Sequence, residues 1–357
     1  MDHFEKIAAR LADYDLDAML LTGEANRFYA SGFHSTGTDG VALVTRNGNY
    51  YFTDSRYTEA AGRCVRNARL EETGRGRGYA VLTEEVVARE NIRRMGFEDA
   101  YMTVQDWERY RKALSCELVP ATELLWKLRA EKDPEELEIM IAAQRIAEKA
   151  LAEVLNDIRP GVTEKELAAL IQYRMLHYGA EDKSFDPIVV SGPNGSLPHG
   201  VPSEKPVQAG EFVTMDIGCI YHGYCSDMTR TVAVGYATEE MERVYQTVLT
   251  AQKVGIAAAR AGVTGREVDG AARAVIDEAG YGAYFGHSFG HGVGVEIHEA
   301  PNASPVNEQP LPAGAVISAE PGIYLPGRMG VRIEDVLWLT DNGCRNLTEA
   351  PKELLIL

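Results

Sequence analysis

The segment Phe212-Val-Thr-Met-Asp-Ile-Gly218 is followed, after a short connection, by Cys225-Ser-Asp-Met-Thr-Arg-Thr-Val232. Both segments are typical of buried strands, and Tyr221-His222-Gly223 between them predicts a turn, so together they form a hairpin. A hairpin centred between positions 221 and 222 places Asp216 directly opposite Asp227, with Cβ atoms about 5 Å apart. Like charges opposed on apolar strands are destabilising, and Asp is a poor strand residue. We therefore expect a cation between these two carboxylates.

A second hairpin repeats this arrangement. Val316-Ile-Ser-Ala-Glu-Pro-Gly322 is followed by Val331-Arg-Ile-Glu-Asp-Val-Leu337, with a turn at Pro326-Gly327-Arg328. A hairpin centred on Gly327 places Glu320 opposite Glu334, again within apolar strands. The sequence therefore predicts four carboxylates in two opposed pairs.

A fifth candidate ligand is His291, in Gly286-His-Ser-Phe-Gly-His-Gly-Val-Gly294, where the glycines allow close backbone approach. Four carboxylates and one imidazole suit Mn²⁺, Co²⁺, Fe²⁺ or Zn²⁺ rather than a thiolate zinc site. In a two-metal arrangement, bridging carboxylates hold the ions about 3.5 Å apart around a shared hydroxide. Each residue alone has an ordinary structural explanation, so the prediction rests on two acidic hairpins occurring together with a glycine-flanked histidine.

The two hairpins belong to a weak internal repeat. Gly161-Val-Thr-Glu-Lys-Glu-Leu167 resembles Gly262-Val-Thr-Gly-Arg-Glu-Val268, and each begins a helix with Thr as N-cap and Glu three residues later. Each is preceded by a long helix, at about 134–158 and 239–260, and is followed by a histidine and an acidic hairpin. Helix caps are common, but the shared order of all these features predicts a duplicated domain.

Three further histidines and one arginine are candidates for the surroundings of the metals. His199 and His298 occupy matching places in the two halves, so we expect both near the metals, where either can stabilise an oxyanion or protonate a leaving nitrogen. With His287, which we expect in the same cleft, they are the candidate substrate-binding residues. Arg332 lies on the same strand face as the last carboxylate and is expected to orient the cluster, a role compatible with a structural ion pair. A hydroxide held by two cations is nucleophilic at neutral pH, so the predicted reaction is hydrolysis.

The residues before this region predict a separate α/β domain. Short apolar runs at 18–21, 41–44 and 50–53 indicate strands, and 4–12, 55–62, 83–95 and 105–114 indicate helices. The predicted domains are 1–125 and 126–357. Near the boundary, Asp133, Pro134 and Glu136 predict a capped helix running to about Asp157.

Composition limits the possible partners of the chain. Its 357 residues carry a net charge of −17, which disfavours nucleic acid and anionic membranes. The five scattered cysteines indicate reduced thiols. The first ten residues lack the apolar core of a signal peptide, and no long apolar run predicts a membrane span, so we expect a cytoplasmic protein.

In its motifs the second half resembles the pita-bread metallopeptidases, and most closely the Xaa-Pro peptidases, aminopeptidase P and prolidase. The motifs occur in the family's order: Leu197-Pro-His-Gly200, Met215-Asp-Ile-Gly218, Ser226-Asp-Met-Thr-Arg-Thr231, Gly290-His-Gly-Val-Gly294, Ile297-His-Glu299, Ala319-Glu-Pro-Gly-Ile-Tyr324 and Val331-Arg-Ile-Glu-Asp335. The first domain resembles the family's creatinase-type N-terminal domain, through Asn26-Arg-Phe-Tyr29 and Thr53-Asp-Ser-Arg-Tyr57. The resemblance implies an α+β pita-bread catalytic domain with a pseudo-two-fold repeat, preceded by a smaller α/β domain.

The resemblance also implies a mechanism and a substrate class. It implies a homodimer that binds two divalent ions per subunit, usually Mn²⁺ or Co²⁺, and cleaves proline-containing peptides before proline. Glu320 would act as the general base, His298 and His199 would bind the substrate or intermediate, and Arg332 would support the site.

One position departs from the family pattern. Several dipeptidase members carry Arg shortly after the His-Glu motif, where it binds the C-terminal carboxylate of a dipeptide, whereas the stretch from His298 to Glu308 has Asn302 and contains no Arg or Lys. We therefore expect an Xaa-Pro aminopeptidase that accepts longer peptides. The alternatives are an Xaa-Pro dipeptidase, a non-peptide amidohydrolase on the same fold, and a binding protein that keeps the fold without catalysis.

Overall fold

The computed structural model describes residues 3–357, which divide into two compact units. The first unit extends to Arg129, and the second runs from Ala130 to Leu357. The sequence placed the boundary between positions 125 and 126, which lie inside helix α6 (Thr122–Ala130). Because this helix is continuous, the division falls at its C-terminal end.

The first unit is built on a mixed six-stranded sheet with the strand order β4-β3-β2-β1-β5-β6. Its strands are β1 (Ala18–Leu21), β2 (Gly40–Thr45), β3 (Asn49–Thr53), β4 (Arg69–Glu72), β5 (Arg94–Phe97) and β6 (Glu117–Pro120). Its other elements are α1 (Phe4–Arg10), η1 (Leu11–Tyr14), α2 (Glu24–Ser31), α3 (Thr58–Cys64), α4 (Tyr79–Glu90) and α5 (Val104–Ala113), besides α6. The predicted strands at 18–21, 41–44 and 50–53 are the three central antiparallel strands, and they are buried.

One predicted helix of this unit is wrong at its C-terminal end. The helix expected over 83–95 is α4, which ends at Glu90 with Asn91 in the left-handed conformation, at φ 55°. The residues that follow form β5, which pairs parallel with β1. Strand pairing and an Asn C-cap thus end the helix before its apolar periodicity does.

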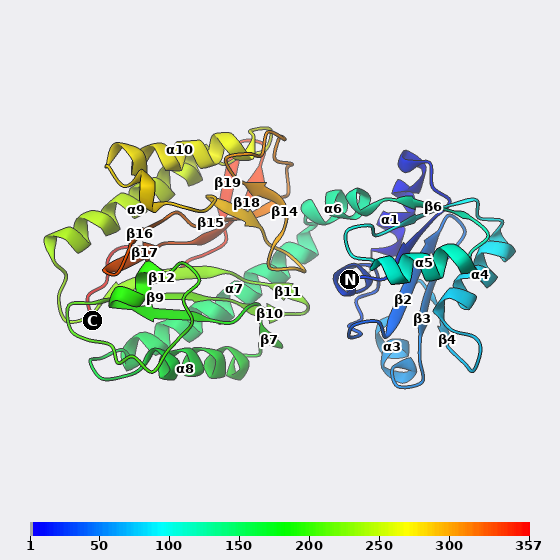
Figure 1. Ribbon diagram of the computed structural model, residues 1–357, viewed down its shortest axis with the longest axis horizontal. Coiled ribbons are helices and arrows are strands. Elements are labelled where there is room, and N and C mark those ends of the chain that lie inside the picture. The colour runs from blue at the N-terminus through cyan, green and yellow to red at the C-terminus, as the bar shows by residue number, and fades with distance from the viewer. Residues whose placement is uncertain (1–2) are drawn as a thin grey trace. The chain divides into compact units, whose positions relative to one another are not determined.

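The second unit has strands between two pairs of helices (Figure 1). Helices α7 (Pro134–Val154) and α8 (Glu164–His177) lie on one side, and α9 (Glu239–Ala258) and α10 (Gly265–Glu278) lie on the other. Each pair packs on its own cluster of buried apolar side chains, so the unit contains two hydrophobic cores. The 3-10 helices are η2 (Leu155–Asp157), η3 (Gly192–Ser196) and η4 (Gly282–Tyr284).

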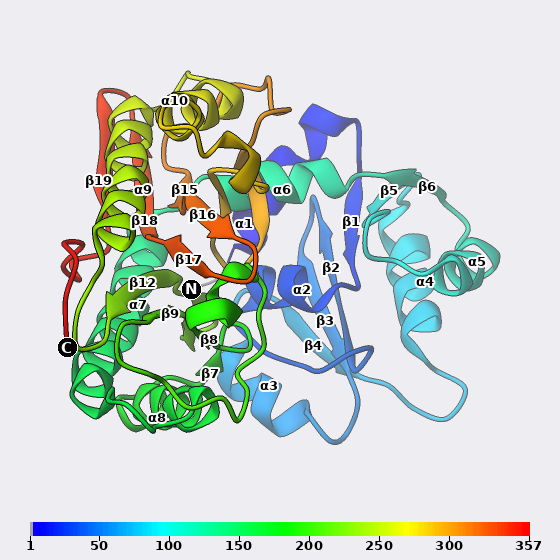
Figure 2. The same ribbon diagram turned by 60° about the vertical axis from the view of Figure 1, so that its left-hand side comes forward.

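The strands between these helices reproduce the predicted duplication. The sheet β12-β9-β8 in the first half corresponds to the run β18-β15-β13 in a five-stranded sheet, β14-β13-β15-β18-β19, in the second. Figure 2 shows β9 and β12 of the first half and β15, β18 and β19 of the second. Two smaller sheets are β11-β10-β7 and β16-β17. The strands are β7 (Asp182–Lys183), β8 (Ile188–Ser191), β9 (Phe212–Ile217), β10 (Cys219–Tyr221), β11 (Tyr224–Cys225), β12 (Met228–Ala233), β13 (Gly290–Gly292), β14 (Glu299–Ala303), β15 (Val316–Ala319), β16 (Gly322–Leu325), β17 (Met329–Arg332), β18 (Asp335–Thr340) and β19 (Gly343–Asn346).

In the first hairpin the predicted register is wrong by two residues. Asp216 is paired with Thr229, and Asp227 lies just before β12. Asp227 is therefore a diagonal neighbour of Asp216 and is not directly opposite it. The turn is centred on His222 and Gly223, whose φ angles are 44° and 76°, as a two-residue type I′ hairpin requires.

In the second hairpin the predicted register is confirmed. Gly322 pairs with Arg332, and Ala319 pairs with Asp335, so Glu320 and Glu334 stand at the same level of the hairpin. Both carboxylates fall between the ladder β15–β18 and the ladder β16–β17, where Pro321 cannot donate a hydrogen bond. The turn centre is Gly327, at φ 70°.

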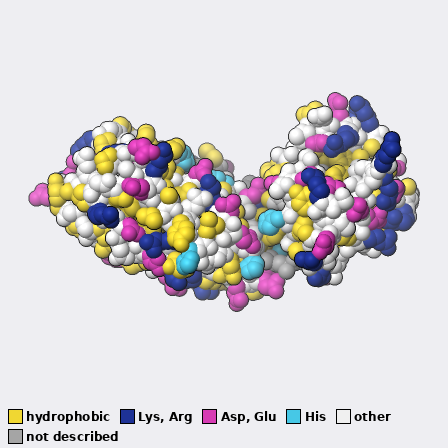
Figure 3. Space-filling model, turned by 90° about the horizontal axis from the view of Figure 1, so that it is seen from below, with side chains coloured by type: hydrophobic (Ala, Val, Ile, Leu, Met, Phe, Trp, Pro, Cys, Tyr) yellow, Lys and Arg dark blue, Asp and Glu magenta, His cyan; other side chains and the backbone are white. Residues whose placement is uncertain are grey.

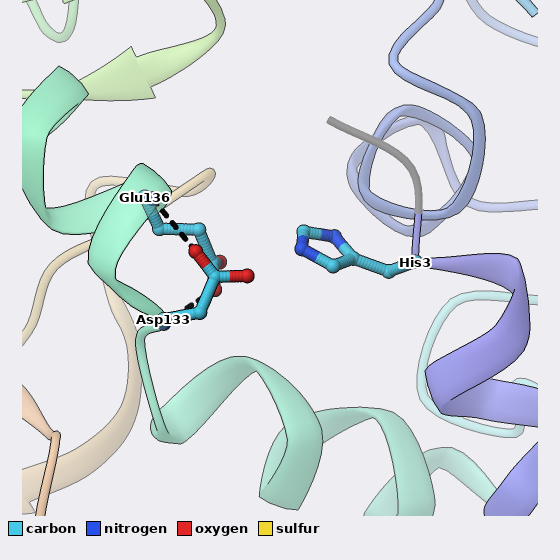
Figure 4. Close-up of side chains that lie close together, drawn as sticks. All are labelled: His3, Asp133 and Glu136. Carbon is cyan, nitrogen blue, oxygen red and sulfur yellow. Dashed lines mark hydrogen bonds between the residues drawn. The ribbon is translucent and has the colours of Figure 1, made fainter.

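Three helix starts of the second unit have the capping boxes that the sequence predicts. At α7, the Asp133 side chain accepts from the backbone N–H of Glu136, whose carboxylate accepts from the N–H of Asp133 (Figure 4). Thr163 and Thr264 make the same exchange with Glu166 and Glu267 at α8 and α10. On the face drawn in Figure 3, Lys and Arg side chains lie among Asp and Glu side chains on both units.

Within residues 3–357, no helix combines the length and the hydrophobicity that crossing a lipid bilayer requires.

Candidate metal centre

The five predicted ligands come from five strand ends or strand interiors of the second unit. Asp216 lies in β9, Asp227 precedes β12, and His291 is the middle residue of β13. Glu320 follows β15, and Glu334 precedes β18. The two sheets therefore supply the ligands together, which is why the fold needs both halves to build one site.

The structure brings four of these side chains close together. One ligand atom each from Asp227, His291 and Glu334 lies within 4.8 Å of the other two. The Nε2 atom of His291 is 3.5 Å from Oδ2 of Asp227 and 3.3 Å from Oε1 of Glu320. The strand of His291 lies so close to β15 that a Cβ on Gly290 would be 2.0 Å from the carbonyl oxygen of Ser318.

Two observations show that this donor set fits cations. The Oδ1 atom of Asp216 is buried and has no hydrogen-bond partner, although buried carboxylate oxygens are ordinarily satisfied. Nδ1 of His291 lies 3.1 Å from the carbonyl oxygen of Gly292 and donates to it, so Nε2 carries no proton in the neutral ring. When the neighbouring carboxyl groups are ionised, this lone pair faces oxygens that are also acceptors, and a metal ion between them would remove the conflict.

The pKa values of the clustered side chains also indicate a site for cations. Burial, followed by repulsion from Asp216 and Glu320, raises the pKa of Asp227 well above its ordinary value. Burial and the neighbouring carboxylates raise the pKa of Glu334 well above its ordinary value, and burial raises the pKa of Glu320. Burial lowers the pKa of His291. Without cations, the cluster therefore favours protonated acids and a neutral imidazole.

Each half of the second unit supports a carboxylate of the other half through a side-chain hydrogen bond. Nη2 of Arg332 donates to Oδ2 of Asp216 at 2.6 Å, and the arginine side chain is only 4% exposed. In the opposite direction, Oγ1 of Thr229 donates to Oε2 of Glu334 at 2.7 Å. Nε of Arg332 also donates to Oγ1 of Thr229 at 3.1 Å, which links the two supports. The predicted placement of Arg332 beside the cluster is thus seen in the structure.

Sequence reasoning gave no role to Tyr324, which joins Arg332 to His287. Nη1 of Arg332 donates to the Tyr324 hydroxyl oxygen at 2.7 Å, and that hydroxyl lies 2.9 Å from Nε2 of His287. A Cβ on Gly322 would lie 2.5 Å from the same hydroxyl, so the glycine makes room for it. The tyrosine stands in a quoted motif, but only the folded hairpin shows what it contacts.

The contacts of His287 restrict its predicted role in substrate binding. Its Nδ1 donates to the carbonyl oxygen of Ser288 at 2.9 Å, and its Nε2 accepts from Tyr324. Burial lowers the pKa of His287, which favours the neutral ring that these bonds need. With both nitrogens engaged, the histidine presents only its ring surface to the cavity that it lines. Substrate binding by His287 stays a prediction, limited to contact with that surface.

A cavity of about 920 Å³ opens onto the carboxylates, and its wall includes the four predicted histidines. His199 follows η3 and His298 precedes β14, so they reach the cavity from the two halves. Both are exposed, and the ring of His298 lies 4.1 Å from that of His291 in an edge-on contact. Their catalytic roles stay predictions. The same wall contains apolar side chains and prolines: Phe185, Pro187, Ile188, Val201, Pro202 and Val306.

A family model described as metallopeptidase family M24 matches residues 138–341, which contain every residue of this site. The chain belongs to metallopeptidase family M24. A second model, described as the creatinase/prolidase N-terminal domain, matches residues 4–130. The predicted fold is therefore confirmed: a creatinase-type N-terminal domain precedes a pita-bread catalytic domain. Members of this metallopeptidase family bind two divalent ions, and the donor set described above fits that number.

Relatives of this M24 metallopeptidase resemble it along its whole length. A Xaa-Pro dipeptidase from Pyrococcus horikoshii is 36% identical, and the match covers 98% of both chains. A solved Xaa-Pro dipeptidase from Bacillus anthracis is 40% identical with a TM-score of 0.94, covering 99% of each chain. A solved X-Pro aminopeptidase from Thermotoga maritima is 36% identical with a TM-score of 0.92, covering 100% of each chain.

Proposed function

We propose that this metallopeptidase is an Xaa-Pro aminopeptidase that removes the N-terminal residue from peptides whose second residue is proline. The observation that carries the proposal is the cavity at the metal centre. Its volume of about 920 Å³ exceeds what a dipeptide fills. Its wall has Asn302 in the stretch after the His-Glu motif, where several dipeptidases of the family carry an arginine. The side chain of Asn302 accepts from Ser304 at 3.0 Å and offers no positive charge to a nearby carboxylate.

The apolar part of the wall suits a proline side chain. The pyrrolidine ring has no polar atom apart from its amide nitrogen, so Phe185, Pro187 and Ile188 offer it favourable burial. Because Xaa-Pro amides lack an N–H, a site for them needs no acceptor at that position. The names of the relatives, which include Xaa-Pro dipeptidases and an X-Pro aminopeptidase, support the same substrate class.

The residues of the site would divide the reaction between them. Two divalent ions held by Asp216, Asp227, His291, Glu320 and Glu334 would supply Lewis acidity that makes water nucleophilic at neutral pH. Glu320 would accept the proton of the attacking water, because its carboxylate lies at the metal centre and opens onto the cavity. His298 and His199 would donate to the carbonyl oxygen and to the proline nitrogen, which must gain a proton as it leaves.

The preferred ions are proposed to be Mn²⁺ or Co²⁺, with Zn²⁺ or Fe²⁺ as alternatives. The donors are mainly carboxylate oxygens with one imidazole nitrogen, and oxygen-rich sites of this kind suit these ions better than soft thiophilic ions.

A dipeptidase is the second candidate, and one observation favours it. Lys183 lines the same cavity and is ion-paired with Asp186, whose side chain is 89% exposed. Exposed pairs of this kind are weak, so the ammonium group is available to a substrate carboxylate. If it binds the carboxylate of a dipeptide, it replaces the arginine.

The deciding experiment compares Xaa-Pro dipeptides with Xaa-Pro-Yaa tripeptides on the Mn²⁺-loaded protein. An aminopeptidase should cleave the tripeptides with the higher kcat/KM, and chelation should abolish the activity until Mn²⁺ or Co²⁺ is restored. Cleavage of dipeptides alone would replace the aminopeptidase by the dipeptidase. Failure of the loaded enzyme on Xaa-Pro peptides of every length would remove both candidates.

A further inference from the structure

The segment that carries His298 closes on a single buried carboxylate, that of Glu299. Oε2 of Glu299 accepts from the backbone N–H of Glu296 at 3.3 Å. A Cβ on Gly294 would be 2.2 Å from Oε1 of the same carboxylate, so a larger residue there would displace the carboxylate. The residues from Gly294 to Glu299 therefore form a tight loop around this group.

A lysine from a distant part of the unit binds the carboxylate at the centre of that loop. Nζ of Lys132 lies 2.6 Å from Oε1 of Glu299, and the two side chains are 1% and 3% exposed. Lys132 lies between α6 and α7, and its backbone N–H donates to the carbonyl oxygen of Gly314 at 3.0 Å. The backbone at the base of the ammonium group is thus hydrogen-bonded as well.

Such a pair does little for stability by itself. Moving two charges out of water costs about as much as their attraction returns, so apolar side chains of the same volume would hold the fold as well. The pair differs from apolar packing in its geometry, because a short charged hydrogen bond fixes the position of both groups. The fixed group here is the residue next to His298.

The same loop is attached to the metal centre from its other end. The carbonyl oxygen of Gly294 accepts from the backbone N–H of Cys225 at 2.8 Å, two residues before the ligand Asp227. The ring of His298 in turn lies 4.1 Å from that of the ligand His291. The loop that bears His298 thus has one end on the first hairpin and the other on Lys132.

We propose that Lys132 and Glu299 are positioning residues that hold the His298 ring at its place in the cavity. The inference rests on the proposed function, in which His298 binds the substrate or the tetrahedral intermediate. The pair acts through the loop and need not touch the substrate.

A kinetic double-mutant cycle tests this with Lys132→Met and His298→Ala in the full-length, Mn²⁺-loaded enzyme acting on an Xaa-Pro-Yaa tripeptide. Displacement of a catalytic group by about 1 Å costs about 100-fold, so K132M should lower kcat about 10- to 100-fold with little change in KM. In the H298A background the same substitution should lower kcat by less than about 3-fold, because the residue it positions is gone. Lys132→Arg, which keeps the cation, should recover part of kcat.

The matched control is Arg174→Met, which breaks the ion pairs of Arg174 with Glu153 and Asp157. These pairs join α8 to α7 and η2, and Arg174 does not line the cavity, so any effect of R174M on kcat should be the same with and without His298. All rates are divided by the folded fraction measured by circular dichroism. If K132M does not fold, the variant K132M/E299M, which removes both charges of the pair, takes its place in the cycle.

A second readout does not depend on activity. The chain has eight histidines, so ¹³C-labelled ring signals in the Zn²⁺-loaded protein can be resolved, and H298A identifies the signal of His298. K132M should shift or broaden that signal, whereas R174M should leave it unchanged. Equal fold-losses from K132M in both backgrounds, or an unaltered His298 signal, would overturn the proposal. If the wild-type enzyme cleaves no Xaa-Pro peptide, the proposed function fails, and the ring signal alone decides whether the pair positions His298.

Discussion

The two halves of the catalytic unit build their acidic hairpins differently. In the first half, Asp216 lies within β9 and is paired with Thr229, and Asp227 is its diagonal neighbour. In the second half, Glu320 and Glu334 stand at one level but outside the strand ladders, where Pro321 interrupts them. Asp216, with its shorter side chain, lies within a regular strand. Glu320 and Glu334, with longer side chains, lie in a break between two sheets.

The supports of the carboxylates are exchanged between the halves. Arg332 from the second half binds Asp216 of the first, and Thr229 from the first half binds Glu334 of the second. The counterpart of Asp216, Glu320, has a neutral support, the Ser318 hydroxyl at 3.1 Å. The duplication thus supplies the scaffold, and the halves differ in their supports: Asp216 is ion-paired with Arg332, whereas Glu320 accepts a hydrogen bond from a neutral hydroxyl.

The largest effect should come from Glu320→Gln. An amide oxygen can still bind a metal but cannot accept the proton of water, so we expect kcat to fall about 10³- to 10⁴-fold with the metal content largely kept. Stopped assays together with elemental analysis of the dialysed protein give both quantities. Retention of more than a tenth of the wild-type kcat would show that the base is elsewhere.

Replacing the two supports that the halves exchange, Arg332 and Thr229, should have the next largest effects, and the two effects should differ in size. Arg332→Met removes the charged hydrogen bond from Nη2 of Arg332 to Oδ2 of Asp216, so we expect metal affinity or kcat to fall about 100-fold. Thr229→Val removes the neutral hydroxyl that donates to Glu334 and accepts from Nε of Arg332, at nearly constant volume and with the guanidinium charge kept, so a smaller fall of about 10-fold is expected. Metal titration followed by activity measures both. Equal losses would mean that the two supports are equivalent after all.

The sequence predicted most of this arrangement because its signals are local. Capping boxes, apolar strand runs and a glycine at the turn each act within a few residues, which is why the helices α7–α10 and the register around Gly327 are confirmed. The register of the first hairpin was missed because His222, which lacks the conformational freedom of glycine, takes a positive φ of 44° beside Gly223. Strand pairing on both sides of the turn selects this backbone conformation.

The contacts of the site needed the folded structure. Tyr324 reaches His287 only because the second hairpin turns back beside the loop after α10, and no spacing in the sequence encodes that approach. The pair of Lys132 and Glu299 joins segments that lie far apart along the chain, and neither residue belongs to a periodic pattern that would single it out.

In the metal-free protein, both halves should lose stability as the pH rises. The folded-state pKa values of Asp227 and Glu334 are raised, so their protonated forms stabilise the fold below the ordinary carboxyl values of 3.8 and 4.5, and this is lost as the pH rises through the folded values. Asp227→Asn and Glu334→Gln should therefore raise the Tm of the metal-free protein, by an increment that grows from pH 5 to 8. Scanning calorimetry after chelation measures it.

The sign should reverse with metal present. If the two carboxylates bind the metal ions as proposed, both variants should have a lower Tm than wild type in the loaded enzyme, since they would bind the ions more weakly. If the rise in Tm of the metal-free variants did not change with pH, the added stability would come from packing rather than from relief of charge repulsion.

The smallest effects should come from the two turns, and they test why the registers differ. Gly327 has φ 70° with open space around its Cα, so Gly327→Ala adds only backbone strain, about 1 kcal/mol, which corresponds to about 2–4 °C in Tm. At His222, also left-handed, His222→Asn removes strain and should raise the Tm by about 1 °C or less. Thermal unfolding of both variants in the metal-loaded enzyme measures the two changes in Tm. Because the type I′ turn sets the position of Asp227 relative to Asp216, H222N should keep full activity, and a lowered kcat would mean that the histidine has a task beyond the turn.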